Sequence, residues 1–154
     1  MNRAHERRLL ELWGLMMPGR PLTGRVSAMW RAIGFQGHDP ATDFRGMGLL
    51  GLDQLHYLAQ TYPVHAHAVL RISQHETAWF PFAITGINVT AFCLTLMRQR
   101  ELQSWFLTLG LHPSTFHEFY CVTFWQFAQF WSHGLERLTP MDFGRVFLQF
   151  QQRV

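Results

Sequence analysis

The sequence predicts an all-α fold, a single compact bundle of about seven or eight helices. Apolar residues recur at helical spacing in one segment after another, and no alternating apolar and polar run is long enough to indicate a sheet. Proline and glycine separate these segments at short intervals, as in bundles of antiparallel helices. The 154 residues suit one domain, 1–154, with one hydrophobic core.

The N-terminal part of the chain is expected to form three helices. Pro18-Gly19 ends the first, and Gly34 ends the second. The segment that follows, up to Arg45, is expected to be a loop. The third helix has one apolar face, formed by Leu49, Leu52, Leu55, Tyr57 and Leu58. The predicted ranges are 4–16, 25–33 and 47–60.

Five further helices are predicted in the rest of the chain. Proline begins several of them, because its fixed φ suits the first helical turn and its missing N–H is not needed there. Glycine ends two of them, at Gly110 and Gly134. The predicted ranges are 63–75, 81–100, 101–109, 112–133 and 139–152. Aromatic residues at helical spacing in the fourth of these predict core positions at Phe116, Tyr120, Phe124, Phe127 and Trp131.

An uncharged run from Thr77 to Met97 approaches membrane-spanning length. Pro81, Gly86, Asn88 and four threonines within it favour a buried core helix over a membrane span. In that helix Asn88 is expected to find a hydrogen-bond partner inside the bundle, since an unpaired buried amide costs about 1–3 kcal/mol. The N-terminal MNRAHERRLL has charges where a signal peptide needs an apolar core.

The basic residues are unusual, because all 13 of them are arginine. Without lysine the chain has no phosphate-binding loop of the G-x-x-x-x-G-K type and no Schiff-base chemistry. The net charge of +3 is too small and too scattered to indicate nucleic-acid binding.

Cysteine and histidine give no sign of a metal site or a disulfide framework. Cys93 and Cys121 both lie in apolar runs, where a free cysteine behaves as a small core residue, and this usage fits a reducing compartment. His65 and His67 lie two residues apart on a predicted helix, so they point to different faces. No metal ligand set or Ser-His-Asp arrangement stands out.

The run from Trp30 to Leu58 is the most informative part of the chain. Asp39-Pro40 indicates a turn, because proline restricts both its own φ and the residue before it. Gly46 and Gly48 leave backbone without side chains, so another surface can approach closely. Arg45 is therefore expected where a loop meets a helix, beside open backbone.

This run resembles the ELMO domain, in particular the ELMO-domain proteins that act as GTPase-activating proteins for Arf-family small GTPases. The family motif combines Trp, Gly-Phe-Gln, Pro, Thr-Asp-Phe-Arg-Gly, Gly and a final Leu-x-Tyr-Phe. Leu58 departs from it, because the family usually has phenylalanine there. The matching residues are Trp30, Gly34, Phe35, Gln36, Pro40, Thr42, Asp43, Phe44, Arg45, Gly46, Gly48, Leu52, Leu55 and Tyr57.

The resemblance implies that the chain stimulates GTP hydrolysis on an Arf-family or Arf-like GTPase. Arg45 would act as an arginine finger, and the partner would carry GTP and Mg²⁺, so the chain needs no cofactor of its own. A cytoplasmic protein, peripheral at organelle membranes, fits this function. The alternative is a non-catalytic interaction module that scaffolds a Dock-type Rac exchange factor, as other members of the wider family do.

Six further motif residues are candidates for partner binding or for positioning the loop. Asp39, Thr42 and Asp43 are expected to be structural, because a carboxylate repels a triphosphate; Asp43 would cap the helix or orient Arg45. Gln36 would contact the GTPase or tie the loop backbone. For Arg45 itself the alternative is an ion pair with Asp43 or with a helix C-terminus. Gly46 and Gly48 complete the set.

Overall fold

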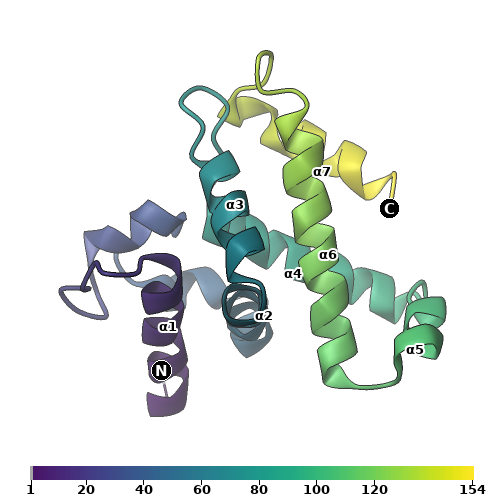
Figure 1. The fold of residues 1–154 in the computed structure, drawn as a ribbon, viewed down its shortest axis with the longest axis horizontal. Helices are drawn as coiled ribbons and strands as arrows, with labels where there is room; N and C mark the ends of the chain where they lie inside the picture. The colour runs from purple at the N-terminus through teal and green to yellow at the C-terminus, as the bar shows by residue number, and fades with distance from the viewer. Residues whose placement is uncertain (1) are drawn as a thin grey trace.

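The computed structural model describes residues 2–154, and over these residues it is all-α, as the sequence predicts (Figure 1). It contains seven α-helices and three short 3₁₀ helices. In chain order these are α1 (Arg3–Met16), η1 (Ala28–Ile33), η2 (Pro40–Phe44), α2 (Gly48–Thr61), α3 (Pro63–Ser73), α4 (Phe82–Arg98), α5 (Gln103–Leu109), α6 (Pro113–Ser132), η3 (Pro140–Asp142) and α7 (Phe143–Gln151).

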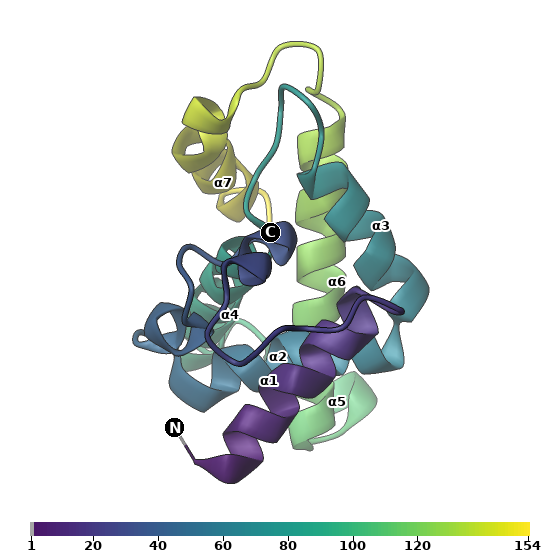
Figure 2. The ribbon, with the colours of Figure 1, turned by 90° about the vertical axis from the view of Figure 1, so that its left-hand side faces the viewer.

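Helix α2 lies at the centre of the helix packing. It contacts α1, α3, α4 and α6, and η2 packs against it as well. Figures 1 and 2 show α6 running along the long dimension of the molecule, with α7 packed at its C-terminal end and α5 at its N-terminal end. The segment that joins α1 to α2 carries η1 and η2, and it forms one flank of the molecule.

The core is built largely from aromatic side chains. All five aromatic residues predicted on α6 are buried, which confirms the helical face read from their spacing. Phe127 packs edge-on against Phe80 and against the phenylalanines of α7. The indole Nε1 of Trp131 donates to the carbonyl of Ala78 at 2.8 Å, so its one polar group is satisfied inside the core.

The uncharged run Thr77–Met97 forms most of α4 and is a core helix, as predicted. The prediction for Asn88 is wrong, because its side chain is only half-buried. Asn88 shares the least buried stripe of α4 with Ile84, Ala91 and Thr95, which recur at helical spacing. No helix within residues 2–154 combines the length and the apolar character needed to cross a bilayer.

Most predicted helices are found within a few residues of their predicted ends, but the segment before α2 differs. The second helix is a 3₁₀ helix of six residues, begun by the Ser27 hydroxyl and ended by Gly34. A further 3₁₀ helix, η2, lies in the segment predicted to be a loop. The apolar face predicted for α2 also needs one correction, because Leu49 is 41% exposed.

The two cysteines lie where the sequence predicts, since Cys93 and Cys121 are both buried and unpaired. Burial raises the pKa of the Cys93 thiol to about 12, so it stays protonated. His65 packs against Trp125 of α6, whereas His67 contacts the carbonyl of Leu15 in α1. The two histidines therefore do point to different faces.

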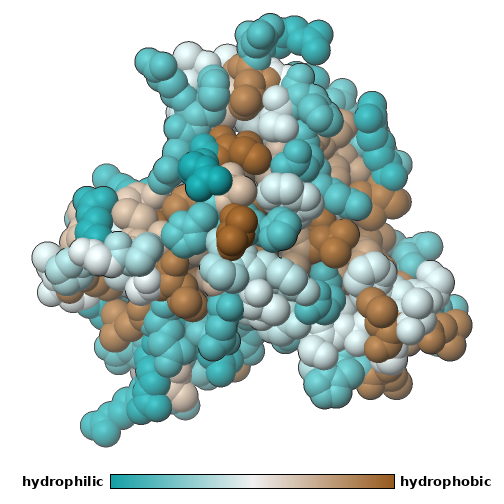
Figure 3. Space-filling model, in the orientation of Figure 1, coloured by the Kyte–Doolittle hydropathy of each residue, from teal (hydrophilic) through white to brown (hydrophobic). Residues whose placement is uncertain are grey.

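Helix α5 carries apolar surface. It buries none of its own side chains fully and is held to α6 by Trp105, whose Nε1 donates to the carbonyl of Thr115 at 2.9 Å. Figure 3 shows apolar residues over this corner of the molecule. The exposed ones here are Leu107, Leu109 and Leu111.

Candidate functional site

Four aromatic rings anchor the run from Trp30 to Leu58 to the rest of the protein. Trp13 of α1, Trp30, Phe35 and Phe44 follow one another edge-to-face, with successive ring centroids 5.4, 5.4 and 5.6 Å apart. All four are buried. The Nε1 of Trp30 donates to the carbonyl of Arg25 at 2.8 Å. This aromatic row links α1 to η1 and η2 and fixes the path of the loop between these two 3₁₀ helices.

Gly34 fixes the same loop to α4. Its φ is +83°, in the left-handed region that favours glycine. A Cβ built on Gly34 would lie 2.2 Å from the backbone nitrogen of Phe82. The carbonyl of Gly34 accepts from the Ile84 N–H at 3.2 Å. Only glycine permits this approach of loop backbone to helix backbone.

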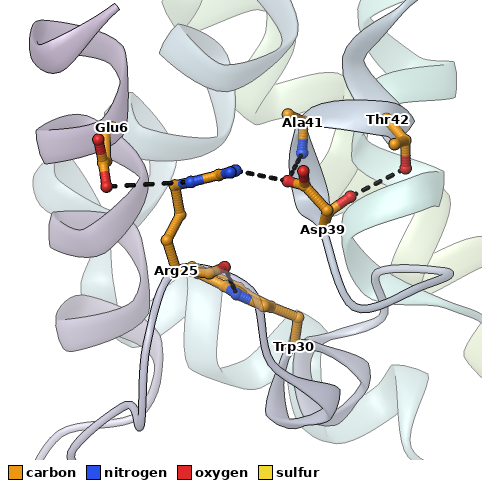
Figure 4. A network of polar contacts seen from close by, with 6 residues as sticks. All are labelled: Glu6, Arg25, Trp30, Asp39, Ala41 and Thr42. Atoms are coloured by element: carbon orange, nitrogen blue, oxygen red, sulfur yellow. Dashed lines mark hydrogen bonds and ion pairs between the residues drawn. The ribbon is translucent and has the colours of Figure 1, made fainter. Parts of the chain in front are cut away.

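Asp39 organises the start of η2 (Figure 4). Its Oδ1 accepts from the Ala41 N–H at 3.0 Å and from the Arg25 guanidinium at 2.7 Å. The Thr42 hydroxyl donates to the Asp39 carbonyl at 2.9 Å, and Glu6 lies 3.9 Å from the Arg25 Nε. Asp39 is therefore the N-cap of η2, and Thr42 closes the first turn, so both have the structural role expected of them.

Asp43 holds the two ends of the loop together. Its Oδ2 accepts from the Gln36 N–H at 3.0 Å. It does not cap α2, because the N-cap residue of that helix is Met47, with no side-chain cap hydrogen bond. Nor does it pair with Arg45, so both roles expected of Asp43 are replaced by this bond across the loop.

Arg45 lies at the C-terminal end of η2, in helical backbone geometry with φ −56° and ψ −39°. Its side chain is exposed, and among residues 2–154 it makes neither an ion pair nor a hydrogen bond. The expected alternative, a structural pair with Asp43, is not what the structure shows. A Cβ added at Gly46 or Gly48 would meet nothing within 4 Å, so the backbone beside Arg45 is open.

The motif residues fall into two groups when sorted by their contacts. Most are buried or bonded inside the protein, and their presence is explained by the fold. Gln36 and Arg45 differ: both side chains are exposed and, within the described residues, unpaired. The residues with an internal role are Trp30, Gly34, Phe35, Pro40, Thr42, Asp43, Phe44, Leu52, Leu55 and Tyr57.

Sequence reasoning missed the role of Tyr57. Its hydroxyl and that of Tyr62 both donate to the carboxylate of Glu118 on α6. That hydrogen bond, together with burial, raises the pKa of Tyr62 to about 12. His117 packs against the Tyr57 ring, and burial lowers its pKa. In the sequence the one indication of this site is Glu118 itself, an acidic residue between apolar residues of a core helix. Its tyrosine partners lie far away in the chain, so the hydrogen bonds could not be predicted.

A cleft of about 780 Å³ also went unpredicted. It lies between the end of η1 and the segment that joins α3 to α4, and Gln36 forms part of its edge. Trp79 lines the cleft and is 48% exposed, although it is a large aromatic residue. Within residues 2–154, no cluster of three or more histidine, cysteine, aspartate or glutamate side chains is placed to hold a metal ion.

The hydrogen bond from the Gln36 N–H to Asp43 should contribute to the stability of the protein. Asp43→Ala is expected to lower the free energy of unfolding by about 1 kcal/mol, because the Gln36 N–H loses its acceptor. Asp43→Asn keeps an acceptor oxygen and should lose less. Urea denaturation of the three proteins measures the difference. Equal stability of the alanine and asparagine variants would show that the bond does not hold the loop.

The fold and the motif together define an ELMO-domain protein, and comparison with known proteins agrees. The family model described as the ELMO/CED-12 family matches residues 1–147, so the chain belongs to this family.

Individual ELMO-domain proteins are also similar to the chain over nearly its whole length. The chain is 43% identical over 156 residues to ELMO domain-containing protein 2 of Mus musculus, covering 99% of this chain and 53% of that protein. It is 37% identical over 153 residues to ELMO domain-containing protein B of Dictyostelium discoideum, with the same coverage. The chain thus spans about half the length of these curated relatives. No solved structure matches it.

Proposed function

We propose that this chain is a GTPase-activating protein for a small GTPase of the Arf or Arf-like family, and that Arg45 is its arginine finger. The observation that carries the proposal is the state of Arg45: its guanidinium is exposed, stands on a fixed backbone and has no partner among residues 2–154. An arginine held for structure would have an acceptor, as Arg25 has in Asp39. Arg45 keeps all its donors available to a partner.

The chemistry requires a guanidinium in this state. During GTP hydrolysis negative charge develops on the oxygens around the γ-phosphate, and an arginine supplied in trans raises the rate by about 10³ to 10⁵. The planar guanidinium offers several donors in one plane, which a lysine ammonium cannot reproduce. The partner GTPase supplies the nucleotide, Mg²⁺ and the attacking water.

The surroundings of Arg45 suit an approaching triphosphate. The two nearby carboxylates, Asp39 and Asp43, are turned toward donors of their own loop. Gly46 and Gly48 leave room for the partner's surface. The aromatic row and Gly34 hold the loop against the core, so Arg45 is positioned before the partner arrives. Arf-family proteins act at membrane surfaces, so we place this activity in the cytoplasm, peripheral to organelle membranes.

Single-turnover GTP hydrolysis tests the proposal. Purified Arf and Arf-like GTPases, loaded with GTP, are followed with and without this chain. Acceleration of at least one of them supports the proposal. No acceleration of any, together with binding to a Dock-type exchange factor, would favour the scaffolding function instead.

The purified chain alone is expected neither to bind nor to hydrolyse GTP. It has no lysine and no glycine-rich phosphate loop to hold a triphosphate. Isothermal titration of the chain with GTP and Mg²⁺ should show no heat of binding. Micromolar affinity for GTP would mean that this chain has a nucleotide site of its own, and would contradict the proposal that the partner GTPase carries the nucleotide.

A further inference from the structure

The cleft beside Gln36 lies next to the proposed finger. Its lining comes from the residues that end η1, from the C-terminal end of α3 and from the first residues of α4. The side-chain amide of Gln74 donates to the carbonyl of Ala32 at 2.9 Å, and the Gly34 carbonyl accepts from the Ile84 N–H, so hydrogen bonds join the two walls. The cleft is therefore part of the folded structure.

Trp79 is exposed in this cleft although its backbone is fixed. The residue before it, Ala78, is fully buried and accepts from Trp131 Nε1, and the residue after it, Phe80, donates its N–H to Ser73 at 2.9 Å. Trp79 itself is 48% exposed, and among residues 2–154 its indole N–H has no acceptor. A large aromatic side chain with a free donor at the edge of a cleft is typical of interface residues that dominate binding energy.

The cleft lies within reach of a partner bound at Arg45. Gln36 N lies 3.0 Å from the Asp43 carboxylate, and Asp43 precedes Arg45 by two residues. Because two residues span at most about 7 Å, Gln36 N lies within roughly 15 Å of the Arg45 backbone. A standard interface of about 800 Å² per partner corresponds to a disc of roughly 16 Å radius. A GTPase over Arg45 would extend to the edge of the cleft at Gln36.

The charges of the cleft indicate the chemistry of its occupant. Arg31 and Glu76, of opposite sign, both line it, so it has no excess charge to attract a phosphate or a nucleic acid. Much of the remaining lining is apolar, including Phe35, Leu70 and Phe82. Such a surface suits an apolar side chain of a partner, with Gln36 and the Trp79 indole available to hydrogen-bond its backbone.

We propose that this cleft is a docking site for the GTPase, in which Trp79 and Gln36 receive an apolar side chain on the GTPase surface while Arg45 reaches the nucleotide. This inference rests on the proposed function and adds a second point of contact to it. Binding and catalysis are then separable: the cleft determines affinity for the GTPase, and Arg45 determines the rate within the complex.

The test separates the Michaelis constant from the turnover number. Trp79→Asp and, independently, Gln36→Ala are expected to raise the KM for the GTP-loaded GTPase, the first by about tenfold or more. Both should leave kcat within about twofold, because Arg45 is untouched. Trp79→Phe should retain most of the affinity. Val64→Asp, which alters an exposed apolar residue at the start of α3, is the matched control and should behave as the parent.

A binding measurement completes the test. With the GTPase loaded with a non-hydrolysable GTP analogue, Arg45→Ala should bind nearly as tightly as the parent, whereas Trp79→Asp should bind about tenfold more weakly or worse. Circular dichroism melting verifies that each variant is folded. A parent that accelerates hydrolysis and a folded Trp79→Asp variant with unchanged KM would overturn the docking site alone. A parent that accelerates no GTPase would overturn the proposed function as well. Loss of self-association by Trp79→Asp, with KM unchanged, would identify a second copy as the occupant.

Discussion

Replacing Arg45 by alanine is expected to reduce stimulated GTP hydrolysis by about 10³-fold or more, because the transition state loses its guanidinium in trans. Arg45→Lys should be nearly as defective, since one ammonium cannot replace the planar set of donors. The melting temperature should not change for either variant, because the Arg45 side chain has no partner within residues 2–154. Single-turnover hydrolysis and circular dichroism melting measure the two effects.

Arg137→Ala is the matched control for this experiment. Arg137 is also exposed, and it lies after α6, outside the motif run. Its removal changes the net charge by the same amount and should leave activation intact. Two results would contradict the finger: full activation by Arg45→Ala, or an equal loss in both arginine variants, which would indicate a general charge effect.

Gly34→Ala is expected to destabilise the protein by about 4 kcal/mol or more, among the largest effects of a single substitution. The new Cβ would lie 2.2 Å from Phe82 N, at a residue whose φ is +83°. Because the three nearest atoms, in Pro81, Phe82 and Ala83, all belong to the backbone, neither a side-chain rotation nor a small shift relieves the contact. The loop or the start of α4 must move, and the Ile84 bond is lost with it.

Gly37→Ala provides the comparison, because it lies in the same loop and a Cβ there would meet nothing within 4 Å. Urea denaturation of both variants gives the difference in unfolding free energy. If Gly34→Ala were as stable as Gly37→Ala, the approach of loop to α4 would have no structural importance. If Gly34→Ala is too unstable to purify, hydrolysis assays of Gly37→Ala still show that the loop tolerates an added methyl group.

The sequence was sufficient for the parts of the fold that depend on local pattern. Periodic apolar residues, with proline and glycine at the ends, located the long helices, and the aromatic positions of α6 were predicted correctly. The 3₁₀ helix η2 was missed because it has only five residues, too few to show a period. Asn88 was misplaced because α4 is apolar on nearly every side, so composition alone does not identify its outer face.

The candidate site was predicted in part. The sequence placed Arg45 at the junction of a loop and a helix, where the structure shows it exposed. The polar contacts were not predictable, because Thr42 and Asp43 are cap types that here bond to Asp39 and Gln36 instead. Trp79 was not recognised because the cleft forms between segments far apart in the chain. Such surfaces depend on tertiary packing and leave no local pattern.

The aromatic row from Trp13 to Phe44 has a thermodynamic consequence for binding of the proposed GTPase partner. Because its rings belong to the buried core, the loop that ends at Arg45 shares a cooperative unit with α1 and cannot open alone. Amide hydrogen exchange in η1 and η2 should accordingly follow global unfolding. The backbone entropy of ordering the loop is lost during folding. On association the side-chain torsions of Arg45, and those of Gln36 and Trp79 in the proposed docking cleft, remain to be frozen, but no binding free energy is lost in ordering the backbone of the loop.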